Sequence, residues 1–317
     1  MTDSLPLISI AIPAYNESEN IDELATRLQV VFEKLSTQYN FEVVICENGS
    51  QDDSWEKLRS LSQSDSRFKI VRLVRNFHME GGMMAALANV SGVACIIMSA
   101  DLQDPPEMIP QFLEKWEEGY ENVYTVITKR HGEGIARRAS AQIFYWLINK
   151  ISDRPVPKNS SDFRLVSRLA YQAFNRLSER NRMVRATWGW LGFNSTAIYY
   201  ERVERYGGKS TFNPIATAGF AVRGILASSA TPLKIIPALG TILSGISFLS
   251  FAIFFVRTIF FGVPFPGWGT IVSLLMLMFG FLFLLLGMLA EYIDMIFREV
   301  QQRPPYIVYD RVGLEEN

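Results

Sequence analysis

The stretch IIMSADLQDPPE (residues 96–107) is the part of the sequence that best indicates the fold. In it an apolar run stops abruptly and is followed by two acids and two prolines. An apolar run of this kind is typical of a buried strand. Asp101 and Asp104 follow it, and the proline pair prevents the chain from continuing as a strand. The stretch therefore predicts a strand that ends by presenting polar side chains at the edge of a sheet.

Segments of alternating type surround this strand over the first 230 residues. LISIAIPAY (7–15) is a short β-rich run, and NIDELATRLQVVFEKL (20–35) has helical spacing. This alternation predicts an α/β fold with a Rossmann-like, mostly parallel sheet and right-handed crossovers. Ligands bind such sheets beyond the carboxyl ends of the strands, where PAYNE (13–17), ENGS (47–50) and ADLQD (100–104) fall. Taken singly, Glu17 could cap the next helix and ENGS could be an ordinary turn.

Composition limits the classes of function. The chain has 317 residues, 49% of them hydrophobic, and a formal net charge of −1, which gives no reason to expect a nucleic-acid partner. Cys46 and Cys95 lie in apolar runs and suit the core of a protein from a reduced compartment better than a disulfide or a metal site. The first residues, MTDSLPLISI, do not resemble a signal peptide. We therefore expect the first 230 residues to stay in the cytoplasm.

Two long apolar runs follow. The run 235–261 carries one charge, Arg257, and the run 269–290 carries none. Because a hydrocarbon core of ~30 Å needs ~20 apolar residues in a helix, each run is long enough to span a membrane. Lys234 before them and Arg298 and Arg303 after them favour both ends in the cytoplasm. The alternative is a pair of core helices in a soluble protein.

The expected organisation is therefore that of a multi-pass protein of the inner (cytoplasmic) membrane. It comprises a cytoplasmic domain (1–230), a transmembrane hairpin (231–298, with spans at about 235–261 and 269–292) and a cytoplasmic tail (299–317). Homo-oligomerisation is left open, because no small-residue pattern in the spans requires a dimer.

Basic residues gather ahead of an apolar helical segment in TKRHGEGIARRASAQIFYWLINK (128–150). The basic residues are Lys129, Arg130, Arg137 and Arg138. This pattern predicts an amphipathic helix in the membrane interface, with its basic start toward phosphate head groups. The alternative is an amphipathic helix packed on the sheet. A second basic loop, RVERYGGKSTF (202–212), contains Arg202, Arg205 and Lys209.

Several motifs together carry a family resemblance. They are PAYNESENI (13–21), ENGSQDDS (47–54), RNFHMEGGMMAAL (75–87), ADLQDPPE (100–107), SSDFRLVSR (160–168), GGKSTF (207–212), the two apolar spans and RPPYIV (303–308). In this order the chain resembles the membrane-anchored family 2 glycosyltransferases that load polyprenyl phosphates. The resemblance implies a GT-A fold, a nucleotide-diphosphate sugar donor, a divalent cation (Mg²⁺ or Mn²⁺) and a polyprenyl phosphate acceptor.

The resemblance also assigns residues. It implies that Asp162 is the catalytic acid and that Asp101 and Gln103 hold the metal, whose positive charge helps a nucleotide diphosphate to leave. For Asp162 the alternative is a surface ion pair with Arg164 or Arg168. The donor-binding residues would be Pro13, Tyr15, Glu17, Glu47, Asn48 and Asp101. The acceptor or diphosphate would be bound by Lys129, Arg130, Arg137, Arg138, Arg164, Arg205, Lys209 and Ser210.

Three positions depart from the family pattern. Ser99-Ala100-Asp101 replaces the usual D-x-D, Glu47-Asn48 replaces two aspartates, and Gly-Gly-Lys-Ser (207–210) replaces Gly-x-Ser-Lys. A neutral Ser99 predicts weaker metal binding, or a role for water or Asp104 in place of the first acid.

The expected function is an inverting transfer of a hexose to a polyprenyl phosphate, with UDP-glucose favoured over GDP-mannose and UDP-linked amino sugars. Three other classes compete. A processive polysaccharide synthase would show a Q-x-x-R-W-like segment and more spans. An inactive membrane-anchored homologue would explain Ser99 and Glu47-Asn48. A pure lipid-binding or flippase subunit would not need the acids at the strand ends.

Overall fold

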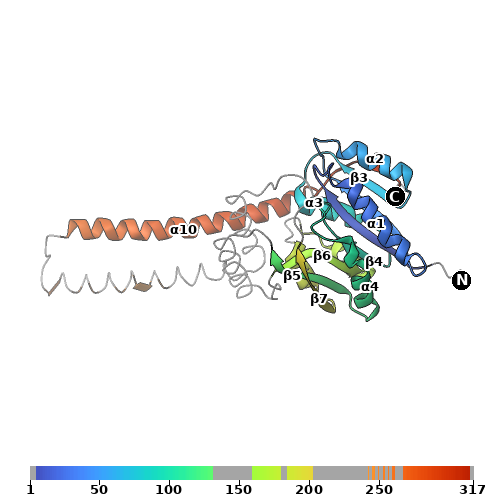
Figure 1. Ribbon diagram of the computed structural model, residues 1–317. Coiled ribbons are helices and arrows are strands. Elements are labelled where there is room, and N and C mark those ends of the chain that lie inside the picture. The colour runs from blue at the N-terminus through green and yellow to red at the C-terminus, as the bar shows by residue number, and fades with distance from the viewer. Residues whose placement is uncertain are drawn as a thin grey trace.

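The structure is a computed structural model, which describes residues 5–130, 159–179, 184–202 and 267–314 and scattered helical positions between 242 and 260. Figure 1 shows a sheet domain and one long helix, α10 (Trp268–Gln301), that extends away from it. The expected interfacial helix after residue 136 lies outside the described residues.

The described strands form one mixed sheet in the order β7-β5-β6-β4-β1-β2-β3-β8. In chain order they are β1 (Leu7–Ala14), β2 (Asn40–Glu47), β3 (Phe68–Leu73), β4 (Ala94–Ile97), β5 (Asn122–Arg130), β6 (Ser160–Ser167), β7 (Ser195–Arg202) and β8 (Val308–Val312). Strands β1 to β4 are parallel, β5 is parallel to β7, and β6 and β8 run antiparallel to their neighbours. The predicted α/β fold with a mostly parallel sheet is confirmed.

Helices cover both faces of the sheet. One face carries α1 (Ile21–Leu35), α2 (Ser54–Ser64), the 3₁₀ helix η1 (Pro106–Met108) and α4 (Ile109–Glu117); the other carries α3 (His78–Ala88), α6 (Arg168–Arg176) and α7 (Val184–Leu191). Alternation along β1 sends Ile10 into the first core and Ala11 into the second. Strands buried on both faces read as continuous apolar runs, which explains LISIAIPA.

Strand directions bring distant segments to one edge of the sheet, which we call the carboxyl edge. Strands β1, β2, β3, β4, β5 and β7 end there, whereas the antiparallel strands β6 and β8 begin there. The register fixes this arrangement, since Ile97 at the end of β4 lies opposite Arg164 in the middle of β6, so that the first residues of β6 extend beyond β4. Polar residues at strand ends and strand starts therefore meet.

The segment after α10 returns to this edge. Gln302 ends the helix with a left-handed φ of 49°, and residues 302–307 lead into β8. The amide of Val74 donates to the carbonyl of Ile307 (3.1 Å), so the β3–β8 ladder begins at the carboxyl edge. Part of the segment that sequence analysis assigns to a tail is thus a strand of the sheet.

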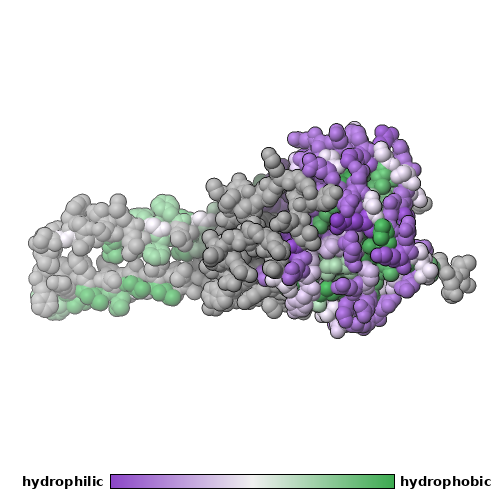
Figure 2. Space-filling model, viewed as in Figure 1, coloured by the Kyte–Doolittle hydropathy of each residue, from purple (hydrophilic) through white to green (hydrophobic). Residues whose placement is uncertain are grey.

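Helix α10 contains Met278–Gln301, 24 residues that are long and apolar enough to cross a membrane and are not buried by the rest of the protein. Its exposed side chains include Phe283 and Ile293, and Figure 2 shows an apolar surface along it. This helix covers the second expected span. The first expected span, at about 235–261, lies outside the described residues except for scattered helical positions.

Gly92, just before β4, is closely surrounded by atoms of β1 and α6. Its amide donates to the Ser9 hydroxyl (2.8 Å), and its carbonyl accepts from the Tyr171 hydroxyl (2.7 Å) and from Arg168 Nε (3.0 Å). A Cβ at this position would lie 2.6 Å from the carbonyl oxygen of Leu7 and 2.6 Å from Ser9 Oγ. No side chain fits there without moving backbone.

Gly92→Ala should lower the free energy of unfolding by at least ~1–3 kcal/mol, because overpacking must displace β1. The matched control is Gly189→Ala in α7, where a Cβ meets nothing within 4 Å. That change should raise the free energy of unfolding by up to about 1 kcal/mol through helix propensity. Chemical denaturation of the full chain in detergent, followed by tryptophan fluorescence, compares the two; equal effects would contradict the packing argument.

Candidate functional site

The loops after β1 and β2 are bound to each other through reciprocal hydrogen bonds. The amide of Asn16 donates to Ser50 Oγ (3.0 Å), and the amide of Gln51 donates to Asn16 Oδ1 (2.8 Å). The amide of Glu17 donates to Ser54 Oγ (3.0 Å) at the start of α2. Asn16 holds a left-handed φ of 55°. The two loops therefore form one unit at the carboxyl edge.

Three predicted donor-binding residues lie in the first of these loops. Pro13 and Tyr15 are half-buried, and Gly82 of α3 packs close to Pro13, where a Cβ would come within 3.2 Å. The Glu17 carboxylate accepts a hydrogen bond from Asn20 Nδ2 (2.5 Å), beside the start of α1. Glu17 thus binds the side chain of Asn20, the residue that precedes α1.

Glu47 and Asn48, at the end of β2, are buried and have protein partners. Glu47 accepts from the amide of Ser50 (2.5 Å) and from Arg72 Nε (3.2 Å). The Arg72 guanidinium in turn lies over the rings of Trp55 (4.4 Å) and Tyr309 of β8 (5.6 Å).

The Asn48 amide group fixes the turn that leads into α3. It donates to the carbonyl of His78 (2.8 Å) and accepts from the amide of Phe77 (2.9 Å). His78 has a left-handed φ of 61°, so this turn needs such support. Both residues of the Glu47-Asn48 departure therefore brace the loops of the carboxyl edge.

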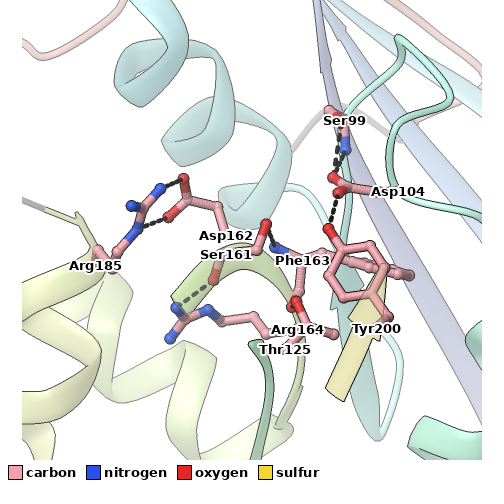
Figure 3. Close-up of polar contacts among 9 residues, drawn as sticks. All are labelled: Ser99, Asp104, Thr125, Ser161, Asp162, Phe163, Arg164, Arg185 and Tyr200. Carbon is pink, nitrogen blue, oxygen red and sulfur yellow. Dashed lines mark hydrogen bonds and ion pairs between the residues drawn. The ribbon is translucent and has the colours of Figure 1, made fainter. Parts of the chain in front are cut away.

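The loop after β4 is organised by Ser99. Its hydroxyl lies 2.7 Å from Asp101 Oδ1 and 2.7 Å from Asp104 Oδ2, and its amide donates to Asp104 Oδ2 (3.0 Å). Asp104 Oδ1 also accepts from the Tyr200 hydroxyl (3.1 Å), as Figure 3 shows. A single hydroxyl hydrogen serves two carboxyl groups here. Burial, assisted by the charge of Asp101, raises the pKa of Asp104 and so favours an additional proton on that acid.

The same loop presents oxygen ligands suited to a hard cation. Leu102 has a left-handed φ of 60°, yet its side chain is buried in the core, which fixes Asp101 and Gln103 on either side of it. Among the described residues no three acidic, His or Cys side chains gather. Mg²⁺ is commonly held by one or two carboxylates together with substrate phosphates, so one carboxylate and one amide oxygen fit a cation shared with a diphosphate.

Asp162, at the start of β6, is held by Arg185 of α7. Arg185 Nε donates to Asp162 Oδ1 (3.1 Å) and Arg185 Nη2 donates to Asp162 Oδ2 (2.5 Å), which makes a bidentate ion pair (Figure 3). Burial raises the pKa of Asp162, but the charges of Arg185, Arg164 and Arg202 outweigh burial and hold that pKa below its ordinary value. Asp162 is therefore a stable anion in the protein.

Two more guanidinium groups adjoin Asp162 and have free nitrogen donors. Arg164 is 3% exposed; its Nη2 donates to the carbonyl of Ser161 (3.1 Å) and its guanidinium lies 5.7 Å from the Trp188 ring centroid. Burial lowers the pKa of Arg164 to about 10. The Nε atoms of Arg164 and Arg202 are buried and have no hydrogen-bond partner in the part of the chain that the structure describes. Three guanidinium groups around one carboxylate leave a positive excess that suits a phosphate group.

Glu80, in the first turn of α3, joins this charged cluster. Burial and the charge of Asp162 raise the pKa of Glu80 to about 7, against the opposing charge of Arg185. It has no hydrogen-bond partner among the described residues.

The structure brings most of the predicted residues together at the carboxyl edge: Pro13, Tyr15, Glu17, Glu47, Asn48, Asp101, Gln103, Asp162 and Arg164. The backbone of Lys129 and Arg130 ends β5 at this edge, and their side chains lie outside the description. Arg137, Arg138, Arg205, Lys209 and Ser210 fall outside the described residues.

Sequence reasoning missed Arg185 and Glu80 as site residues. Arg185 stands in α7 and Glu80 stands in HMEGGMM (78–84), and both segments are far from Asp162 in the sequence. For Glu80, the family motif RNFHMEGGMMAAL (75–87) was the one feature of the sequence that could have indicated a site residue.

Comparisons with known proteins identify relatives over nearly the whole chain. A family model described as glycosyl transferase family 2 matches residues 9–174. The uncharacterized glycosyltransferase YkcC of Bacillus subtilis is 38% identical over 307 residues, which cover 97% of this chain and 94% of the relative. A prophage-derived bactoprenol glucosyl transferase of Shigella flexneri is 34% identical over 301 residues, covering 95% and 97%.

Among solved structures, mannosyl-3-phosphoglycerate synthase from Rubrobacter xylanophilus is similar with a TM-score of 0.48 and 14% identity. The similarity covers 73% of this chain and 75% of that one.

Arg185→Gln should lower the free energy of unfolding by ~1–3 kcal/mol near neutral pH, because it leaves the half-buried Asp162 carboxylate without its partner. The lowered pKa of Asp162 means that the pair stabilises the protein above the ordinary Asp pKa of about 4 and stops doing so as pH falls through the lowered value. The difference from wild type should therefore shrink in acid.

The control for this prediction is Lys115→Gln, which breaks the exposed Lys115–Glu118 pair (2.6 Å). Such surface pairs contribute little to the free energy of unfolding. Denaturant titrations at neutral and acid pH measure both variants, and an Arg185→Gln effect no larger than that of Lys115→Gln would rule out a stabilising pair.

Proposed function

The chain belongs to glycosyl transferase family 2, and on that premise we propose that it transfers a hexose from a nucleotide-diphosphate sugar to a polyprenyl phosphate at the cytoplasmic face of the membrane. The observation that carries this proposal is the cluster of three guanidinium groups around Asp162, at the same sheet edge as the Asp101 loop. The bactoprenol glucosyl transferase relative favours glucose, and hence UDP-glucose as donor.

The donor would bind against the loops after β1, β2 and β4. Asp101 and Gln103 would hold a divalent cation, Mg²⁺ or Mn²⁺, which when bound neutralises the charge of the diphosphate leaving group. Asp101 Oδ1 is already occupied by Ser99 Oγ (2.7 Å) and by the amide of Gln103 (3.2 Å). These two contacts orient the carboxylate before the ligand arrives, which reduces the reorganisation that binding requires.

The acceptor phosphate would bind among Arg164, Arg185 and Arg202. The second pKa of a phosphate monoester is about 6, so the acceptor is largely ionised near neutral pH and needs orientation more than deprotonation. Arginine forks match phosphate oxygens and provide that orientation. Asp162 would act by fixing the Arg185 guanidinium (2.5 and 3.1 Å), since both of its oxygens are committed to it.

The stereochemical outcome follows from a direct displacement. The acceptor oxygen would attack the anomeric carbon from the face opposite the leaving diphosphate, so an α-linked donor would give a β-linked lipid product. No covalent enzyme intermediate is needed.

The membrane anchor would hold the carboxyl edge close to the lipid head groups. Helix α10 is long enough to cross the bilayer, and its end is joined by residues 302–307 to the start of β8 at that edge. The expected first span would complete a multi-pass hairpin in the inner membrane, with the flanking Lys and Arg residues on the cytoplasmic side.

The direct test is transfer of label from UDP-glucose, GDP-mannose or a UDP-linked amino sugar into an organic-extractable lipid. Purified protein in detergent receives undecaprenyl phosphate with Mg²⁺, Mn²⁺ or a chelator. We expect glucose transfer that requires metal and falls by roughly 100-fold in Asp162→Asn, because misplacing a substrate-orienting group has effects of that size. Transfer of another sugar would identify a donor other than UDP-glucose. No transfer by folded protein would favour the interpretation that the chain is an inactive homologue.

A second prediction concerns the Ser99 departure. Ser99→Asp adds a carboxylate beside Asp101, so the Mn²⁺ concentration for half-maximal activity should fall by roughly tenfold, because affinity for hard cations rises with the number of charged ligands. Ser99→Ala serves as the comparison, since it removes the hydroxyl without adding charge. An unchanged or weaker metal response in Ser99→Asp would show that position 99 does not face the cation.

A further inference from the structure

The acid assigned to catalysis by family resemblance is poorly suited to accept a proton. Both Asp162 oxygens accept from Arg185 (3.1 and 2.5 Å), and the surrounding arginines hold its pKa below the ordinary value. A general base works best when its pKa lies near the working pH. Asp162 is therefore a better anchor for Arg185 than a base.

Glu80 is the other acid of this cluster, and its backbone is held in a fixed place. It stands in the first turn of α3, directly after the turn that the Asn48 side chain fixes at Phe77 and His78. The next residue, Gly81, is covered by the carbonyl of Pro305, where a Cβ would come within 3.0 Å. The α3 start is thus enclosed between β2 and the segment before β8.

The surroundings of Glu80 match the needs of a proton acceptor for phosphate. It is half-buried, has no hydrogen-bond partner among the described residues, and experiences the charges of Asp162 on β6 and Arg185 on α7. Burial and Asp162 disfavour its ionised form, and a bound phosphate anion would disfavour it further. We propose that Glu80 takes and keeps the last proton of the acceptor phosphate, while Asp162 is a positioning residue for Arg185. This inference rests on the proposed function.

The proposed reaction balances in protons and electrons without another reactant. The proton of a monoanionic acceptor phosphate moves to the Glu80 carboxylate, and a phosphate oxygen forms the new bond to the anomeric carbon. The bond from that carbon to the nucleoside diphosphate breaks, and its electron pair leaves with the diphosphate. Glu80 later releases its proton to water. The same complex forms when protonated Glu80 meets a phosphate dianion.

The bound complex therefore contains one shared proton, and this sets the sign of the pH dependence. Glu80 is protonated below its pKa of about 7 and ionised above it. Above that pH an ionised Glu80 repels a dianionic phosphate, so kcat/KM for the acceptor should fall by up to about tenfold for each further pH unit.

The experiment measures kcat/KM for undecaprenyl phosphate from about pH 6 to about pH 9, with saturating UDP-glucose and Mn²⁺, for the full chain in detergent. Wild type should show the decline above about pH 7. Glu80→Gln carries a neutral hydrogen-bond donor at every pH, so the decline should disappear. The control Glu114→Gln removes an exposed acid of α4 and should keep the wild-type profile.

A second measurement needs no variant. Calorimetric binding of a short-chain prenyl phosphate to wild type near pH 8, in two buffers of different ionisation enthalpy, should show uptake of close to one proton. Wild type that transfers no sugar at any pH would reject the proposed function itself. Active wild type with no proton uptake, or a Glu80→Gln profile that keeps the decline, would overturn the role of Glu80 alone.

Discussion

A sheet covered by helices on both faces has little room for charged side chains in the middle of its strands, and the arrangement of the site follows from this constraint. Ile10 and Val44 are fully buried in the middle of their strands, where an ionised group would lose its hydration. Antiparallel β6 begins beyond the end of β4, with Arg164 opposite Ile97. The chain therefore collects acids and arginines from distant segments at one edge, outside the two hydrophobic clusters.

Sequence patterns predict the parts of this arrangement that depend on local periodicity. Continuous apolar runs indicate the central strands, and alternation along β6 places Phe163 in the core and Arg164 on the opposite face. The pairing of β8 with β3 is not predictable in this way, because its residues Val308–Val312 are mostly exposed and have no clear apolar pattern. The partner of Asp162 depends on packing, since Arg185 lies on a separate helix.

The departures from the family pattern are accommodated by specific contacts. The Ser99 hydroxyl lies 2.7 Å from both Asp101 and Asp104, where a second carboxylate would add repulsion in the absence of a cation. Glu47 reaches Arg72, which is itself enclosed by aromatic rings. Such contacts show that the substitutions are integrated with their neighbours, which is consistent with a working site that uses fewer fixed negative charges than the family pattern.

The short connection between α10 and β8 restricts how the sheet domain can move. Six residues, 302–307, span at most about 20 Å when fully extended, and the strand that follows is hydrogen-bonded into the sheet. With α10 as the proposed membrane anchor, the carboxyl edge would stay close to the bilayer. A lipid substrate would then reach this edge by two-dimensional diffusion within the bilayer. The water-soluble donor would reach it by three-dimensional diffusion through the aqueous phase.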